Sequence, residues 1–254
     1  DPIVSAYRVD LHVKILDDRV VERAKRRGLD VLVYAPHFTR LPDVRREAEK
    51  YSDDDLLVLP AREIFTGNWR NRKHVLALDL TEPIPDYITL DGAMAELDRQ
   101  DAVVLVPHPE YLSFSLDSSD IHTYRELIDA IEVYNVKEVG VDVKRARSLA
   151  RSLECPTFGS SYAHLHGSIG EVWTEFDLEI DSAQDLYDAL RNGDPRRVYR
   201  RRGPSHTLRR AFELGHLAWE NTYEKLDRVL LSGLEPTHPH HIAYQGRFED
   251  VAVY

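Results

Sequence analysis

Histidine and glutamate residues recur at the ends of short apolar segments through the first two thirds of the chain. Imidazole nitrogens and carboxylate oxygens are common ligands of zinc and of other divalent transition metals. Seven such residues lie at or near a segment end: His12, His37, Glu63, His74, His108, Glu132 and His164. Random placement of the 12 histidines of this chain would rarely produce that order. The residue types and positions therefore predict a metal site.

The apolar segments and the stretches between them have the pattern of an α/β protein. Runs such as VLVY at 31–34 and VVLV at 103–106 are apolar on both faces, as expected for buried parallel strands covered by helices. Amphipathic stretches between them predict helices, the first beginning after Asp17 or Asp18 and ending at Gly28. Because the C-terminal ends of parallel strands converge on one face of a barrel, we expect the seven side chains to meet in one bowl. Only His74 does not lie near the C-terminal end of its predicted strand.

In this order, the motifs resemble those of the polymerase-and-histidinol-phosphatase (PHP) family of metal-dependent phosphoesterases. The similarity runs from about Val9 to Gly170, with a weaker match to a PHP-associated segment beyond it. It rests on DLHVK, APHF, PAREI, KHVLAL, VPHPE, IEVYN and SYAHLHGSIG. The resemblance implies a distorted (βα)7 TIM-like barrel at residues 1–180. It also implies a C-terminal helical extension at residues 181–254, packed on the same domain. Within this extension, the residue pattern at 205–230 predicts a long helix.

Three residues depart from the family motifs, and all three lie at the metal site that the resemblance implies. Lys14 stands where DLHxH has its second histidine, Pro36 replaces an acidic residue, and Tyr162 stands where SDAH has its aspartate. Of the ligands that the family uses for one of its ions, this chain then keeps only His12 and Glu63. An ammonium about 4 Å from a dication is repelled by roughly 8 kcal/mol at an effective dielectric constant of 20. We therefore expect Lys14 and an ion at that position to exclude each other.

The resemblance leaves a ligand set for one or two divalent ions, which we expect to be zinc, manganese or iron. The more complete set consists of Glu63, His74 and His108. A further ion would use His37 and His164, with Asp17 or Asp18.

The sequence predicts a divalent-metal-dependent phosphoesterase acting on a small phosphorylated metabolite or nucleotide. Lys14 would provide positive charge in place of the missing ion, with Arg62 as a helper, and Tyr162 would donate to a phosphate oxygen. Two other readings stay open: Lys14 pairs with Glu63 without a catalytic role, and Tyr162 only fills the space that an ion left. The alternative function is a non-catalytic PHP-like module that binds a phosphorylated ligand or nucleic acid.

Charge is unevenly distributed along the chain. The net charge of -11 opposes non-specific binding of nucleic acid by the surface as a whole. Residues 191–210, however, hold eight arginines and one acidic residue, Asp194. This stretch predicts contacts with a phosphate-rich ligand, a nucleotide or a nucleic-acid strand, through Arg200, Arg201 and Arg202. A solvated surface paired with acids elsewhere is the alternative.

The cysteine content, the length of the apolar runs and the C-terminal tail indicate where the chain works and what it contacts. Cys155 is the only cysteine, so no disulfide can form within the chain, and a reducing cytoplasm is expected. The sequence has no run of eighteen apolar residues, and we expect no membrane partner. The C-terminal tail carries three histidines that would either bind metal or belong to a docked segment: His238, His240 and His241.

Overall fold

In a computed structural model of the chain, residues 6–68, 71–110, 115–137, 140–219 and 236–253 are described. Their strands form two five-stranded sheets. The first has the order β10-β9-β1-β2-β3 and consists of β1 (Tyr7–Val13), β2 (Val31–Tyr34), β3 (Leu57–Pro60), β9 (Val172–Phe176) and β10 (Arg196–Arg200). The second follows chain order and consists of β4 (Arg62–Thr66), β5 (Lys73–Leu78), β6 (Val103–Val106), β7 (Ala130–Tyr134) and β8 (Thr157–Gly159).

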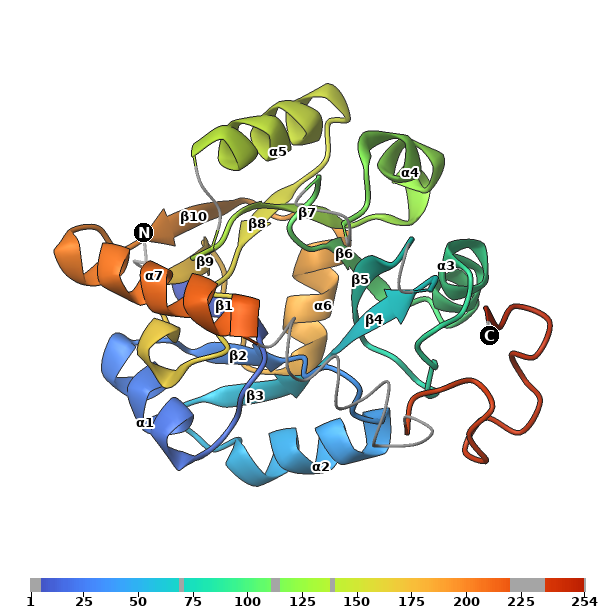
Figure 1. Cartoon of the computed structure of the whole chain (residues 1–254). Coiled ribbons are helices and arrows are strands. Elements are labelled where there is room, and N and C mark those ends of the chain that lie inside the picture. Colours follow the sequence, from blue (N-terminus) through green and yellow to red (C-terminus); the bar gives the residue numbers. More distant parts are fainter. Residues whose placement is uncertain (1–5, 69–70, 111–114, 138–139, 220–235, 254) are drawn as a thin grey trace.

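Helices lie around the two sheets (Figure 1). They are α1 (Asp18–Arg27), α2 (Leu41–Tyr51), α3 (Leu90–Arg99), α4 (Ser118–Thr123), α5 (Gly140–Ser152), α6 (Ala183–Arg191) and α7 (Pro204–Trp219), with 3-10 turns η2 (Arg125–Leu127) and η3 (His166–Ser168). The expected boundaries of the first helix are confirmed. The Asp17 side chain accepts a hydrogen bond from the Val20 amide at 2.9 Å, and Gly28 ends the helix in the left-handed conformation with φ 68°.

The α/β class is confirmed, but the closed (βα)7 barrel is not. Four strand pairs are parallel, whereas β4–β5, β5–β6, β1–β9 and β9–β10 are antiparallel. The sequence predicted parallel strands in a barrel, and PAREI and KHVLAL were among the segments expected to contribute to it. Only residues 67–72 separate β4 from β5, which is too short for a crossover connection and sufficient for an antiparallel return.

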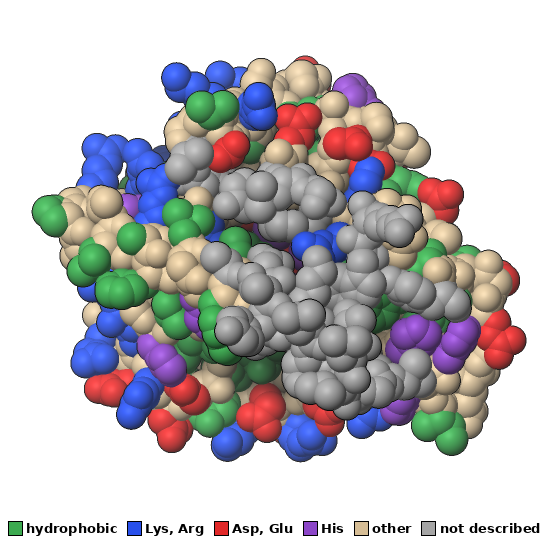
Figure 2. All heavy atoms as spheres, viewed as in Figure 1, with side chains coloured by type: hydrophobic (Ala, Val, Ile, Leu, Met, Phe, Trp, Pro, Cys, Tyr) green, Lys and Arg blue, Asp and Glu red, His purple; other side chains and the backbone are tan. Residues whose placement is uncertain are grey.

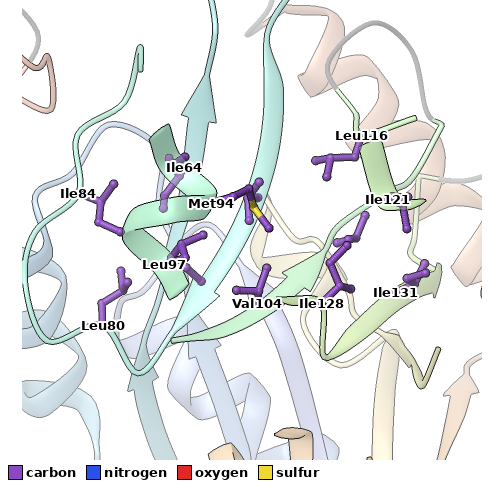
Figure 3. Packing of buried hydrophobic residues seen from close by; sticks show 14 of the residues in the cluster. Ile64, Leu80, Ile84, Met94, Leu97, Val104, Leu116, Ile121, Ile128 and Ile131 are labelled. Atoms are coloured by element: carbon purple, nitrogen blue, oxygen red, sulfur yellow. The ribbon is translucent and has the colours of Figure 1, made fainter. Parts of the chain in front are cut away.

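Three large apolar clusters hold the layers together. One lies between the sheets and includes Val9, Leu105 and Phe176, on which α6 packs Leu186 and Leu190. A second joins β1 and β2 to α1 and α2. The third lies under α3, α4 and α5, where Met94 and Leu97 of α3 point toward the second sheet (Figure 3). These clusters fix the strands whose ends carry the polar residues.

The C-terminal part of the chain contributes to the same buried layers. The boundary predicted at residue 180 falls between β9 and α6, and Phe176 and Leu186 share one apolar cluster. Of the helix expected at 205–230, α7 accounts for the part up to Trp219, and residues 220–230 lie outside the described part. The histidine-bearing tail packs on the second sheet's cluster through Tyr244 and Phe248. None of the described helices is long and apolar enough to span a membrane.

Gly159 at the end of β8 provides a test of this packing. An added Cβ would lie 2.4 Å from Val198 Cγ1 of β10 and 3.1 Å from the Tyr134 carbonyl oxygen. We expect Gly159→Ala to lower the free energy of unfolding by about 1–3 kcal/mol through overpacking, as measured by urea denaturation. Gly140→Ala is the matched control, because no described atom lies within 4 Å of its Cβ position and alanine favours a helix. Equal stability of the two variants would contradict the close contact between β8 and β10.

Candidate functional site

The six predicted ligand residues lie in one cluster around the buried carboxylate of Glu63 in β4. They are distributed over both sheets: His12 in β1, His37 after β2, Glu63 in β4, His74 in β5, His108 after β6 and His164 after β8. Both sheets therefore contribute to a single group of side chains.

Antiparallel pairing explains how His74 reaches the cluster from the start of its strand. β5 runs antiparallel to β6, so its first residues lie at the same edge as the C-terminal end of β6. His74 pairs with Phe65, and residues directly opposite each other point to the same side of a sheet. Glu63 lies two residues from Phe65 and shares that side. The result is a distance of 3.3 Å between His74 Nδ1 and Glu63 Oε1.

The two oxygens of Glu63 have different surroundings. Oε1 lies 3.0 Å from His108 Nε2, 3.3 Å from His74 Nδ1 and 3.6 Å from His12 Nε2. Oε2 accepts a hydrogen bond from the Lys14 ammonium and lies 3.2 Å from His37 Nδ1. One oxygen therefore faces three imidazoles, and the other is held by a buried cation.

Burial and neighbouring charges together determine the protonation of Glu63 and of the histidines around it. Burial alone would raise the pKa of Glu63, but Lys14 and the surrounding histidines hold that pKa well below its usual value. Burial, and then Lys14, lowers the pKa of His12 well below the ordinary histidine value, and burial also lowers the pKa of His108. The site thus combines an ionised carboxylate with neutral imidazoles at His12 and His108, the forms that bind metal ions.

The donor set fits a divalent transition metal. Ligand atoms of Glu63, His74 and His108 all lie within 4.8 Å of one another, and all three residues are buried. Both ring nitrogens of His12 are buried and have no hydrogen-bond partner among the described residues. Such orphaned buried polar atoms are rare and require an explanation, for which an ion is a standard candidate. These residues are therefore a candidate metal centre.

Tyr162 packs inside the cluster. Its ring stacks on that of His12, with centroids 4.7 Å apart, and lies 5.0 Å from the ring of His108. Two lysine ammoniums lie near this ring, Lys14 at 5.9 Å and Lys137 at 3.6 Å from its centroid. The aromatic face is favourable for both cations.

Lys137 was not identified from the sequence, although it follows the end of β7 as the other polar residues follow their strands. Its side chain is buried, and its ammonium donates to the Tyr162 carbonyl oxygen and lies 2.7 Å from His164 Nδ1. It also lies 3.4 Å from Glu213 Oε2 of α7. The site therefore contains two buried lysines. Scanning for lysine as well as histidine and glutamate at strand ends would have found it.

Glu132 holds His108 and two neighbouring polar residues in position through hydrogen bonds. Its carboxylate accepts hydrogen bonds from the His108 amide at 2.7 Å, from Asn135 at 3.0 Å and from Ser160 at 2.5 Å. His108 has a positive φ of 34°, an unusual conformation for a residue with a side chain. The contact with Glu132 helps to hold that backbone, and hence the imidazole, in place.

Other predicted residues lie away from the Glu63 cluster. Arg62 neighbours Glu63 on β4 and points to the opposite face, where it donates to Asp86 at 2.9 Å and to the Thr39 carbonyl oxygen. The structure therefore does not place it where the sequence reading did. Asp17 caps α1 and lies 2.7 Å from His166 Nε2.

The arginines near the end of β10 have separate partners. The Arg200 guanidinium lies 4.6 Å from the centroid of the Tyr134 ring, and Arg201 Nε donates to the Gly170 carbonyl oxygen at 3.2 Å. Arg202 is exposed. The partners of Arg200 and Arg201 therefore belong to different parts of the chain.

The Lys14–Glu63 pair should contribute strongly to stability, because removing one partner leaves a buried charge uncompensated. We expect Lys14→Met, which nearly preserves volume, to lower the metal-free protein's free energy of unfolding by about 3–5 kcal/mol. Lys25→Met is the control, since Lys25 pairs with Asp53 at the surface and should give a much smaller loss. Chemical denaturation in the presence of a chelator measures both. Similar losses in the two variants would show that Glu63 does not depend on Lys14.

Comparison with known proteins agrees with this geometry. Residues 142–195 match the family model described as PHP-associated. No curated protein matches the sequence significantly. Among solved structures, PsfC from Pseudomonas syringae PB-5123 is 20% identical with a TM-score of 0.61, and the match covers 87% of this chain and 98% of that one.

Two endonuclease Q structures share the fold at lower identity. The Pyrococcus furiosus lesion-specific enzyme is 16% identical with a TM-score of 0.57. A complex with a 27-mer duplex containing an abasic lesion is 15% identical with a TM-score of 0.55. Each match covers 76% of this chain and 58% of the endonuclease chain, so this chain spans little more than half their length. The PHP-associated match at residues 142–195 and the shared fold agree with the resemblance to the PHP family that the order of the motifs indicated.

Proposed function

We propose that the chain is a divalent-metal-dependent phosphoesterase with a reduced metal site and a lysine-rich phosphate pocket. The observation that carries this proposal is the set of buried ligand atoms on Glu63, His74 and His108, with the Lys14 ammonium on the other side of Glu63. Zinc, manganese and iron all accept this combination of imidazole and carboxylate ligands.

The ion would be held by Glu63, His74 and His108, with His12 beside them. When bound, it would activate a water molecule and neutralise charge on the phosphoryl group. The chain's own residues supply the remaining charge. Lys14 and Lys137 place two ammoniums near the Tyr162 ring, where they can attract phosphoryl oxygens, and the Tyr162 hydroxyl can donate to the same group.

The proposed substrate is a phosphoester of a small metabolite, a nucleotide or a nucleic acid. The endonuclease Q neighbour was solved with a DNA duplex, which supports including nucleic acid in this class. The second candidate is a non-catalytic module that binds a phosphorylated ligand. The observation that favours it is the Lys14–Glu63 pair, because this pair neutralises the carboxylate without any ion.

Metal content and hydrolysis should depend on the same residues. We expect wild-type protein to bind about one zinc or manganese ion tightly and to release p-nitrophenol from p-nitrophenyl phosphate. His108→Ala should lose the ion and about 100-fold or more of the rate, because a bound ion contributes several kcal/mol to transition-state stabilisation. His240→Ala in the tail is the control and should keep both. Elemental analysis and a colorimetric assay measure the two quantities. A metal-loaded wild type with no activity on any phosphoester tested would favour the binding module.

Restoring the family residues should restore an ion position. We expect Lys14→His combined with Tyr162→Asp to raise metal content by about one ion per chain, because a repelling ammonium is replaced by a ligand and a carboxylate is added. Elemental analysis of the wild type and the double variant tests this, with the exposed pair Lys144→His and Tyr199→Asp as a surface control. Three ions in the wild type would contradict the loss of an ion position, whereas none in the wild type would favour the binding module.

A further inference from the structure

A second group of charged side chains lies where α1, η3, β10 and α7 meet. Four arginines from distant parts of the sequence lie near the buried residue Glu171, which immediately precedes β9, and two of them contact its carboxylate. Arg23 and Arg27 come from α1, Arg201 follows β10, and Arg209 lies in α7. We call these four residues the arginine cluster. Only two of them belong to the stretch 191–210 that the sequence singled out.

Contacts to Glu171 and to nearby carbonyl groups hold these arginines. Arg27 Nη2 lies 2.9 Å from Glu171 Oε1, and Arg209 Nη1 donates to the same oxygen. Arg23 Nη2 donates to the Gly167 carbonyl oxygen at 2.7 Å, and Arg201 Nε donates to that of Gly170. In these contacts between described residues each guanidinium uses one nitrogen, although it carries five N–H donors.

The arginine cluster carries more positive charge than its carboxylate can balance. Arg27 and Arg209 contact one oxygen of Glu171, His206 Nδ1 at the start of α7 lies 2.9 Å from the other, and Arg23 and Arg201 add two more charges nearby. Burial, and then Arg209, lowers the pKa of Arg23; burial, and then Arg201, lowers that of Arg27. The arginines thus repel one another, and an added anion would relieve that repulsion. The N-terminus of α7 adds a favourable dipole for an anion.

The arginine cluster lies beside the candidate metal centre. Glu213 is one helical turn beyond Arg209 on α7, about 6 Å along the axis. Its carboxylate accepts a hydrogen bond from the Leu165 amide at 3.0 Å and lies 3.4 Å from Lys137 Nζ. Figure 2 shows Lys and Arg side chains on both sides of α7, toward β10 and over α1. The two groups of charged side chains are therefore neighbours along α7, with Glu213 and Lys137 between them.

We propose that the arginine cluster binds a phosphate group of the substrate other than the one that is hydrolysed. This inference rests on the proposed function for the position of the reacting group. Guanidinium groups match phosphate oxygens in geometry and remain charged at all physiological pH values. The second phosphate belongs either to a nucleic-acid backbone or to a small ligand with a diphosphate group, and binding experiments can separate these sources.

The test uses Arg23→Gln combined with Arg201→Gln, because both arginines are held by carbonyl groups and their removal leaves Glu171 paired with Arg27, Arg209 and His206. Binding of a fluorescent single-stranded oligonucleotide of about 12 nucleotides is measured by anisotropy with a chelator present, so that no hydrolysis occurs. We expect the dissociation constant to rise at least about fivefold. The slope of log affinity against log salt should fall by about 1.4, or about 0.7 for each lost phosphate contact.

Arg147→Gln combined with Arg197→Gln is the matched control. It removes the same charge from α5 and the exposed face of β10 and should leave both quantities near their wild-type values. Equal binding by the wild type and the Arg23/Arg201 variant would overturn the proposal, as would wild-type protein that binds neither the oligonucleotide nor ADP. Binding of ADP alone, weakened in that variant, would support the site and assign it to a small ligand. Hydrolysis of p-nitrophenyl phosphate by wild-type protein is scored separately, so its absence would contradict the phosphoesterase and not the binding site.

Discussion

The structure is organised by the need to neutralise one buried carboxylate, that of Glu63. An ionised carboxylate removed from water is costly unless a charge and hydrogen bonds replace its hydration shell. Lys14 supplies the charge on one oxygen, and three imidazoles surround the other. These partners come from both sheets, so the strands must be held in fixed relative positions. The apolar clusters between and outside the sheets provide that rigidity.

Two further buried carboxylates have cationic partners of their own. Glu213 lies beside Lys137, and Glu171 lies among the arginine cluster. Glu213 also accepts backbone hydrogen bonds from the segment after β8, so α7 is attached to the edge of the candidate metal centre. Helix α7 therefore contacts both charged groups, through Glu213 at the candidate metal centre and through Arg209 at Glu171.

Much of the site was predictable because polar residues at the ends of apolar strands are conspicuous. Histidines and Glu63 were found in this way, and Asp17 and Gly28 marked the first helix by their capping chemistry. The strand direction of β5 was missed, since an apolar segment carries no information about its neighbours. Arg62 was misplaced for a related reason: alternation along a strand sends adjacent side chains to opposite faces, and the sequence alone did not show which face was inward. Only two of the four residues in the arginine cluster were found from the sequence. The other two come from α1, which lies near α7 only in the folded chain.

The Lys14–Glu63 pair also bears on how the chain reaches its folded state. In small zinc domains the ligands repel or remain unsatisfied without metal, so folding waits for the ion. In this chain the Lys14 ammonium is part of the polypeptide, so it can neutralise the Glu63 carboxylate once β1 and β4 have assembled in the fold. The Lys14–Glu63 pair can thus stabilise the folded site without an ion, and the proposed metal would bind to ligands that are already in position.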